Sequence, residues 1–550
     1  MEAVVIVLFL LTAVVISGAV AHALPIPVPV PLVQIACGAL LVAVENFQIL
    51  LYPELFFILF LPPLLFLDGW RISKQALSKD KWLILALAFG LVFVTILGGG
   101  LLINWLLPAV PLPICFAFAA ILSPTDPIAV SAITEKLPLP KRLMDILEGE
   151  ALLNDASGLV SMKLAVAVAL TGYFSASEAV ALLIWSSIAG LFAGILVTYI
   201  MTYLVIFWSS RFGEEAGTPI LVSLLTPFAA YFLGDLIGAS GILAAVGAGF
   251  AVTYAEGITA VDSSVRIKRG VIWDAVQSTA NGTIFILLGQ QLPYIIQRVA
   301  IPDGVNNYLY FSWLIFCVII IFVVLMLCRF IWLFILLQLR WFNLTLVNKN
   351  ISTLLKFNSI ASLAGVRGTI TLAGVLTLPF VLNDGLPLAD RDLIIFLAAG
   401  VIILSLIVAT FALPILLANS NFTIEGSNEA QLEQAARIAA TEAAILAVEK
   451  SVQNWANLKH GRGDLYNIAS LRVIESYKQK HDDLLAASDQ KQDVNLILQY
   501  EKKIRVIGLK AERKMYFQLY KNKKISEESM DNFLREVDLQ EAKVTKMSNI

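Results

Sequence analysis

The chain contains few of the residues that most soluble enzymes use for catalysis. Only 15% of its 550 residues are charged, three are histidine and four are cysteine. The histidines do not cluster with cysteines or carboxylates, and the cysteines lie in apolar stretches without the spacing of a metal site or a disulfide framework. The net charge of −2 offers no attraction to a nucleic acid. These scarcities argue against a metal-dependent enzyme, and we expect neither a bound cofactor nor a nucleic-acid partner.

Apolar sequence, in contrast, is abundant. Hydrophobic residues make up 58% of the chain and the mean hydropathy is +0.81, too high for a soluble protein whose surface must be covered by polar side chains. Because a membrane-spanning helix needs about 20 apolar residues, the sequence predicts an all-α polytopic membrane protein. Thirteen candidate spans lie near residues 2–21, 28–45, 49–67, 82–106, 111–133, 145–171, 178–208, 218–236, 239–256, 274–291, 309–337, 359–380 and 392–418. The first lacks a basic N-terminal stretch, so we expect a retained span rather than a cleaved signal peptide.

The Lys and Arg residues of the connections predict how the spans are oriented. If the polar tail lies in the cytoplasm, thirteen spans place the N-terminus outside. The connections expected outside then carry only Arg298 and Arg391, whereas those expected inside carry all the other basic residues of the connections. This bias favours the odd number of spans.

Residues 419–550 form a polar tail that we expect to be a separate helical cytoplasmic domain. Its stretches show apolar residues at helical spacing, and no catalytic motif occurs in it. We expect it to pack against the membrane domain or a partner subunit, or to bind a regulator that the sequence does not identify.

One predicted span is interrupted by the sequence "ILSPTDPIAV", which contains Ser123, Thr125 and Asp126 between two prolines. Proline removes a backbone donor and pushes the preceding residue towards an extended conformation. Unwound backbone within a membrane is tolerated only where it is buried in protein or lines a wet cavity. The freed carbonyl oxygens of this segment and the Asp126 carboxylate would suit a hard cation. The alternative is a structural kink in which Asp126 only caps the second half-helix.

The next span contains "LEGEALLNDASGLV", which places several polar side chains inside the membrane. Glu150 and Asn154 are four residues apart and share a helix face, and Asp155 lies about 100° around the helix from Asn154. Glu148 is closer to the cytoplasmic end and could be interfacial. Ionisable groups at this depth are functional candidates by default.

Two arginines also lie in apolar spans, Arg329 in "LMLCRFIWLF" and Arg367 in "LAGVRGTITLAG". A buried guanidinium stays charged and needs acidic or carbonyl partners. The sequence leaves the choice of carboxylate open among Glu150, Asp126, Asp155 and Asp68. The glycines beside Arg367 make this span a second candidate for an interrupted helix. Asp68, after a double proline, could instead be interfacial, and Lys163 could extend to the membrane surface.

The interrupted spans are the fifth and the twelfth, so they lie seven positions apart in the order of spans. The first six and the last six spans would then have opposite orientations. Inverted repeats with broken helices that meet near the midplane are typical of secondary transporters. The topology therefore predicts two inverted six-helix repeats with two crossing broken helices.

Several motifs occur together in the order and spacing of the cation:proton antiporter family, which includes sodium/proton exchangers. They are "FLPPLLFLDGW", "SPTDPIAV", "GEALLNDASGLV", "SGILAAVGAGF", "FILLGQQLP" and "AGVRGTITLAGVL". The chain resembles this family over essentially residues 1–418, and its tail is similar to the cytoplasmic extension of bacterial members. The resemblance implies a multi-pass protein of the cell membrane, usually a homodimer, that serves pH homeostasis. It also implies an elevator-like core around spans 4–6 and 11–13 and a dimerisation part around spans 1–3 and 8–10.

The resemblance further implies roles for individual residues. Asp155 corresponds to the carboxylate that binds cation and proton in turn. Asn154 is expected to belong to the same ion- and proton-binding set, and it places the chain in the generally electroneutral Asn-Asp branch. Thr125 and Asp126 correspond to ligands on the broken helix, which would make Asp155, Asp126 and Thr125 the residues that contact Na⁺. The remaining assignments are the core ion pair Glu150–Arg329 and the accessory residues Arg367, Asp68 and Ser123. Asn281 departs from the animal exchangers, which have a glutamate at about this position.

The expected mechanism is competition. One carboxylate that binds either H⁺ or an alkali cation couples the two gradients, and the choice among Na⁺, Li⁺ and K⁺ stays open. Three alternatives are a proton-coupled transporter of another small substrate, a channel, and an intramembrane aspartyl protease that uses Asp126 and Asp155. The chain lacks the Gly-x-Gly-Asp arrangement expected of such a protease.

Overall fold

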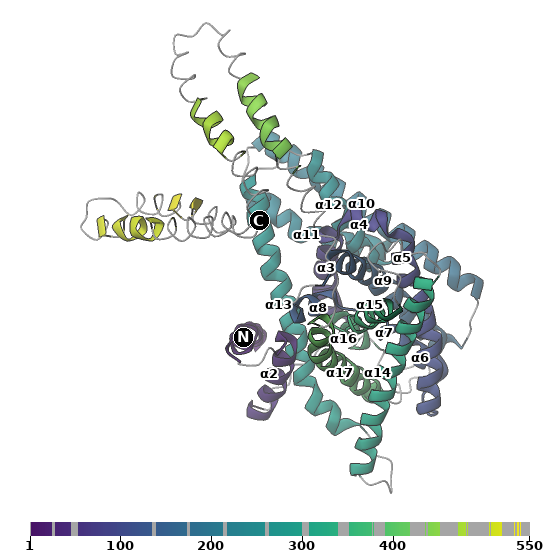
Figure 1. Ribbon diagram of the computed structural model, residues 1–550. Coiled ribbons are helices and arrows are strands. Elements are labelled where there is room, and N and C mark those ends of the chain that lie inside the picture. Colours follow the sequence, from purple (N-terminus) through teal and green to yellow (C-terminus); the bar gives the residue numbers. More distant parts are fainter. Residues whose placement is uncertain are drawn as a thin grey trace. The chain divides into compact units, whose positions relative to one another are not determined.

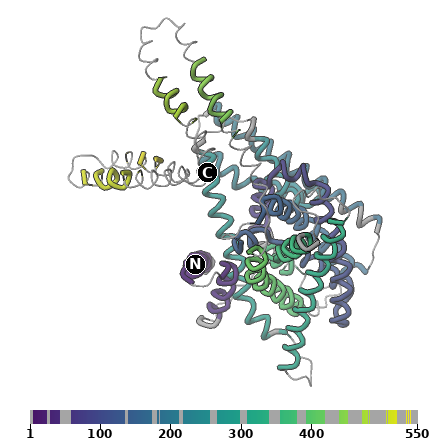
Figure 2. The backbone as a smooth tube through the Cα atoms, in the orientation of Figure 1, coloured from purple at the N-terminus to yellow at the C-terminus, as the bar shows by residue number. Residues whose placement is uncertain are grey.

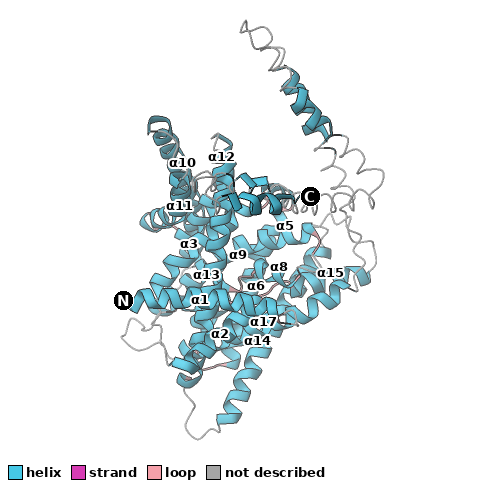
Figure 3. Cartoon of the chain, turned by 90° about the vertical axis from the view of Figure 1, so that its left-hand side faces the viewer, coloured by secondary structure: helices cyan, strands magenta, loops and turns pink. Residues whose placement is uncertain are grey.

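The computed structural model contains only helices as regular elements within the residues it describes (Figure 3). These residues are 2–24, 28–45, 53–134, 139–172, 176–212, 217–258, 263–299, 307–338, 351–376, 378 and 391–418, with scattered positions between 435 and 540. The chain divides into two compact units, Met1–Phe422 and Thr423–Ile550. The predicted start of the tail at residue 419 falls in 419–434, which lie outside the described residues.

Figure 1 labels most helices of the first unit, and Figure 3 labels α1. The N-terminal half of this unit comprises α1 (Glu2–Ala23), α2 (Val30–Glu45), α3 (Pro53–Arg71), α4 (Lys74–Lys79), α5 (Lys81–Leu85), the π-helical turn η1 (Ala86–Leu91), α6 (Val92–Leu106), α7 (Leu112–Ile121), α8 (Pro127–Ile133) and α9 (Lys141–Thr171). The remainder comprises α10 (Ala176–Phe212), α11 (Gly217–Leu236), α12 (Gly241–Ile258), α13 (Ser263–Arg298), α14 (Asn307–Gln338), α15 (Ile351–Leu363), α16 (Thr369–Leu376) and α17 (Arg391–Ala418).

Each range in which the sequence predicts a span contains a helix or consecutive shorter helices. Within the described residues, eight helices are long and apolar enough to cross a membrane, and three further apolar helices are shorter. One of the shorter helices is α7, the first half of an interrupted helix. The all-α fold is therefore confirmed, while the total of thirteen spans and the inverted repeat stay predictions.

The distribution of side chains is that of a protein surrounded by lipid. Large apolar side chains point outwards along α10, where Trp185 is 57% exposed and Phe192 is 67% exposed. Charged side chains are instead found in the interior, with Glu150 0% and Arg329 1% exposed. Soluble proteins almost never bury charged residues unless they are paired. The chain is a multi-pass membrane protein with an internal polar network.

The helices α3, α10, α11, α12 and α13 form one closely packed body. A separate apolar cluster that includes Phe66, Ala244 and Trp273 joins them. Gly249 of α12 lies so close to α3 that a methyl group there would collide with the Phe66 carbonyl oxygen. We call these five helices the scaffold.

The helix α9 shows how local sequence sets the limits of an element. It begins directly after Pro140, whose ring suits the residue before a helix, and it ends at Gly172, which adopts the left-handed conformation with φ of 68°. Its middle carries the buried Glu150, Asn154 and Asp155. Thirty-one uninterrupted residues therefore present these three side chains to the helices around them.

The second unit is described only in short helical segments, the longest being 438–450, 471–479 and 508–516. Leu509 and Val537 form its small buried cluster, with Tyr516 packed against them. Tyr516 also stacks on Phe533, with the ring centroids 5.0 Å apart.

Candidate functional site

Two interrupted helices meet in the interior of the first unit. The chain leaves helical geometry between α7 and α8 and again between α15 and α16. The two breaks touch each other, because the Asp126 N–H donates to the Val366 carbonyl at 2.8 Å. The tube in Figure 2 shows these segments side by side although more than 200 residues separate them. The four half-helix ends therefore gather in one place.

Asp126 caps the half-helix α8. Its backbone is extended, with φ of −115° and ψ of 95°, and its Oδ1 accepts hydrogen bonds from the N–H groups of Ile128 at 3.0 Å and Ala129 at 3.1 Å. The carboxylate also lies against Gly368, where an added methyl group would collide with it. A negative charge at a helix N-terminus is stabilised by the helix dipole. The capping role that the sequence left as an alternative is thus present.

Arg367 performs the opposite task at the end of α7. Its guanidinium donates to the carbonyl oxygens of Ser123 at 2.5 Å and Pro124 at 3.1 Å. Its own N–H donates to the Ser405 Oγ at 3.1 Å, which fixes the second break to α17. Carbonyls left unpaired at a helix C-terminus favour a cation. The first break therefore supplies Asp126 to the start of α8, and the second break supplies Arg367 to the end of α7.

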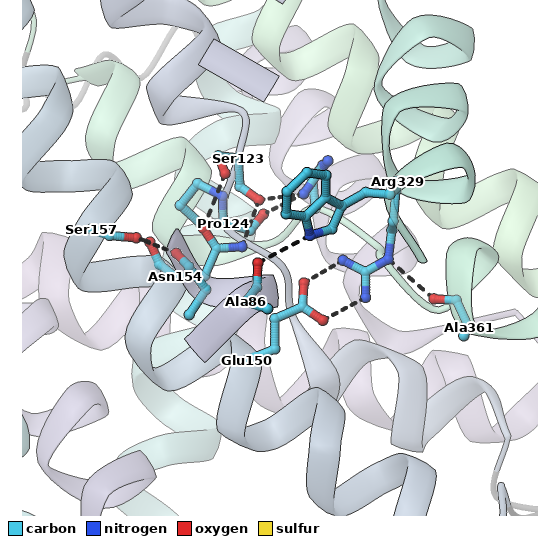
Figure 4. A network of polar contacts seen from close by, with 11 residues as sticks. Ala86, Ser123, Pro124, Glu150, Asn154, Ser157, Arg329 and Ala361 are labelled. Carbon is cyan, nitrogen blue, oxygen red and sulfur yellow. Dashed lines mark hydrogen bonds and ion pairs between the residues drawn. The ribbon is translucent and has the colours of Figure 1, made fainter. Parts of the chain in front are cut away.

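The buried ion pair joins three helices. Arg329 of α14 donates to both carboxylate oxygens of Glu150 on α9, and the Nη2–Oε2 distance is 2.7 Å. Its Nε also donates to the Ala361 carbonyl near the end of α15 at 3.1 Å, as Figure 4 shows. A two-point contact of this kind is the strongest geometry for an Arg–carboxylate pair. Among the four carboxylates that the sequence left open, the structure pairs Arg329 with Glu150.

A cavity of about 320 Å³ opens beside the breaks. Its walls contain four carboxylates, Asp68, Asp126, Glu148 and Asp155, together with Thr125. Within the described part of the chain, no three Cys, His, Asp or Glu residues come close enough to hold a metal ion. The carboxylates are therefore distributed along the cavity wall, an arrangement that suits passage of a cation rather than a cluster for a multivalent metal.

Asp155 is the most enclosed of these carboxylates. It is 2% exposed, and its Oδ1 has no hydrogen-bond partner. Buried polar atoms are normally hydrogen-bonded, and one left without a partner at the wall of a cavity is a position where a ligand can bind. The scaffold helices α3 and α13 line the same cavity through Asp68 and Asn281.

The comparisons with known proteins decide the family. The profile of the family described as "Sodium/hydrogen exchanger, transmembrane" matches residues 8–419. The chain belongs to this family. An uncharacterized Na⁺/H⁺ exchanger of Escherichia coli, YjcE, is 38% identical over 548 residues and covers 98% of each chain. A sodium, potassium, lithium and rubidium/H⁺ antiporter of Bacillus subtilis is 35% identical over 543 residues, which are 98% of this chain and 77% of the relative.

A solved structure has the same fold. The sodium proton antiporter MjNhaP1 of Methanocaldococcus jannaschii matches with a TM-score of 0.55 and 20% identity, covering 76% of this chain and 99% of that chain. The predicted family and the predicted all-α fold are confirmed. The relatives are antiporters by name, in agreement with a transporter rather than an enzyme.

The structure brings some of the predicted exchanger residues together and separates others. Thr125, Asp126, Asp68 and Asp155 line one cavity. Asn154 does not. Its Nδ2 donates to the Ser123 carbonyl and its Oδ1 accepts from the Ser123 hydroxyl, both at 3.0 Å, so its amide is occupied by the break (Figure 4).

Lys163 lies exposed on α9 and is not among the residues that line the cavity.

Sequence reasoning missed the π-helical turn η1. Its freed carbonyls accept hydrogen bonds from two neighbouring helices, Ala88 from the Ser157 hydroxyl at 2.8 Å and Ala86 from the Trp332 indole at 3.0 Å. Such turns occur often at functional sites. This turn braces α9 two residues after Asp155. Nothing in the periodicity of an apolar span distinguishes a π turn from an α-helix.

Proposed function

We propose that this chain exchanges Na⁺, or another alkali cation, for H⁺ across the cell membrane through competition for the Asp155 carboxylate. The observation that carries the proposal is that Asp155 lines the cavity and that its buried Oδ1 has no hydrogen-bond partner. A carboxylate that is enclosed by protein gains from binding either a proton or a cation, because both remove its unpaired charge. It cannot bind both at once.

The charges support an electroneutral cycle. Asp155 carries no net charge when it holds either one proton or one monovalent cation. The Glu150–Arg329 pair is neutral as a unit and is fully enclosed. Asp126 and Arg367 neutralise half-helix ends. One cation would thus exchange for one proton without net movement of charge.

The cation would be held by oxygen atoms from the first break and from α9. Thr125 and Asp126 line the cavity beside Asp155 and provide carbonyl and carboxylate oxygens. We assign Asn154 to positioning, because its hydrogen bonds with Ser123 hold the break against the helix that carries Asp155. Asp68 and Glu148 add negative charge along the path of the cation.

Alternating access would follow from movement of two bodies. The breaks, α9, α14 and α17 are tied together by buried polar contacts, and the scaffold is tied together by close apolar packing. The cavity lies between these bodies, since its wall takes residues from α3 and α13 and from α8, α9 and α16. We propose that the polar core moves past the scaffold as an elevator and that helices of the scaffold mediate a homodimer.

Several further features belong to the same proposal. The bias of basic residues favours a cytoplasmic C-terminus and an N-terminus outside. The tail would bind a regulator of exchange. The B. subtilis relative is named for four alkali cations, so K⁺, Li⁺ and Rb⁺ are candidate substrates beside Na⁺.

The test is proton flux in everted vesicles that contain a quenched pH dye. The wild-type chain should restore fluorescence on addition of Na⁺, and Asp155→Asn should abolish this response while the protein is still inserted and folded. Normal exchange by Asp155→Asn would overturn the proposal. A response that generates a membrane potential would overturn its electroneutral form, and a potential-sensitive dye in the same vesicles measures it.

A further inference from the structure

A second buried oxygen at the cavity wall lacks a partner. Thr371 of α16 is 1% exposed, and its Oγ1, like the Oδ1 of Asp155, makes no hydrogen bond. Both residues line the same cavity. An enclosed hydroxyl without a partner is unfavourable, so two residues of one cavity wall that each carry such an oxygen indicate a common ligand.

The broken helix explains why the Thr371 hydroxyl is unpaired. A threonine within a helix usually donates to the carbonyl four residues earlier, as Thr410 does to Leu406 at 2.6 Å. Thr371 is the third residue of α16, so the residue four positions earlier is Arg367, which lies in the break. The interruption that brings the half-helix ends together therefore also leaves this hydroxyl free for another ligand.

The directions of three helices place Thr371 opposite Asp155. Ser123, in the break after α7, lies at Asn154 of α9, and Ala120 of α7 lies at Gly158, so α9 and α7 are antiparallel. Helix α16 is also antiparallel to α7, because Val366 contacts Asp126 whereas Gly374 approaches Ile121. Helices α9 and α16 consequently run in the same direction.

The register of α9 and α16 is set at the next turn. A methyl group at Gly374 would lie 3.2 Å from the Leu159 Cδ2. One helical turn before this contact, α16 presents Thr371 and α9 presents Asp155 on the corresponding faces. The two side chains make no hydrogen bond to each other, so the Thr371 hydroxyl and the Asp155 Oδ1 are both available to a third group.

We propose that the Thr371 hydroxyl is a ligand of the transported cation, opposite Asp155. This inference rests on the exchange function proposed above and adds a side-chain ligand from the second interrupted helix. A hydroxyl oxygen coordinates an alkali cation but does not titrate in the physiological range. Thr371 therefore raises the affinity for the cation without adding a proton-binding group, and so tunes cation binding separately from proton binding.

The test uses the full-length chain in proteoliposomes and compares the apparent KM for Na⁺ and for Li⁺ with the maximal rate. Thr371→Val keeps the shape and removes the hydroxyl, and we expect the KM for Na⁺ to rise about fivefold or more with the maximal rate retained. Thr371→Ser should restore the KM. Thr410→Val is the matched control, because it also removes a helix hydroxyl, and it should leave the KM unchanged.

A wild-type KM in Thr371→Val, or a lower maximal rate without a change in KM, would overturn the assignment. If Thr371→Val is not recovered in folded form, Thr371→Ala in the same assay takes its place with the same expectation. These results differ from failure of the exchange function itself, which would show as absent cation-dependent proton flux in the wild-type chain.

Discussion

Removal of one partner from the Glu150–Arg329 pair should destabilise the protein far more than removal of both. Both side chains are almost fully enclosed, at 0% and 2% exposure. Glu150→Gln leaves a buried guanidinium with its charge uncompensated, and Arg329→Met does the same to the carboxylate. Breaking a buried pair in this way lowers the free energy of unfolding by about 3–5 kcal/mol.

In the double variant both charges are removed, so no buried charge is left without a partner. What remains is the loss of partners for the Ala361 carbonyl and for the amide that Glu150→Gln introduces, about 1–3 kcal/mol each. The sum of the two single effects should therefore exceed the effect of the double variant by about 3 kcal/mol or more. Reversible unfolding in mixed micelles, with increasing denaturing detergent, measures the three free energies.

The control is the exposed ion pair of Arg71 and Asp274, 2.5 Å apart, whose side chains are 42% and 68% exposed. Arg71→Met should lower the free energy of unfolding by about 1 kcal/mol or less. Additive effects of Glu150→Gln and Arg329→Met, or a loss in either single variant no larger than in the control, would refute the reasoning.

Three other predictions concern the breaks. Asp126→Asn should lower stability by about 1 kcal/mol through a weaker cap, while cation-dependent proton flux persists at a reduced rate; complete loss of flux with unchanged stability would assign the proton site to Asp126 instead. Gly368→Ala should slow exchange, because the methyl group meets the Asp126 carboxylate, whereas Gly18→Ala has nothing within 4 Å and should exchange at the wild-type rate; equal rates in the vesicle assay would contradict this. Asn154→Ala removes two hydrogen bonds to the first break and should lower stability by about 1–3 kcal/mol in the unfolding assay; unchanged stability would show that the break does not depend on them.

The sequence was sufficient to predict where the broken helices lie and which charged residues are enclosed. The prolines on either side of Thr125 and Asp126 disfavour a continuous helix, although α3 contains the adjacent Pro62 and Pro63 without a break. A carboxylate or guanidinium within an apolar span is expected to be buried with a partner. These rules are local, so the break at "SPTDP" and the polar face of α9 could each be predicted from a short stretch of sequence.

The partners of these residues were not readable, because they depend on how distant helices pack. The residues alone allowed four carboxylates for Arg329, and the pairing with Glu150 was expected only from the family resemblance. In the structure, the packing of α14 against α9 and α15 brings Arg329 to Glu150. Asn154 and Asp155 are adjacent in sequence, yet one bonds to Ser123 and the other faces the cavity. The free hydroxyl of Thr371 could be recognised only after the start of α16 was known.

The central claim is that a cation and a proton compete for Asp155. The most direct measurement is the number of protons released when Na⁺ binds to the purified protein, obtained by titration calorimetry in buffers with different enthalpies of ionisation. At a pH where Asp155 is protonated before Na⁺ is added, the wild-type chain should release one proton for each Na⁺ bound, and Asp155→Asn should bind no Na⁺. Binding of Na⁺ without proton release across the whole pH range, or undiminished binding by Asp155→Asn, would contradict the account.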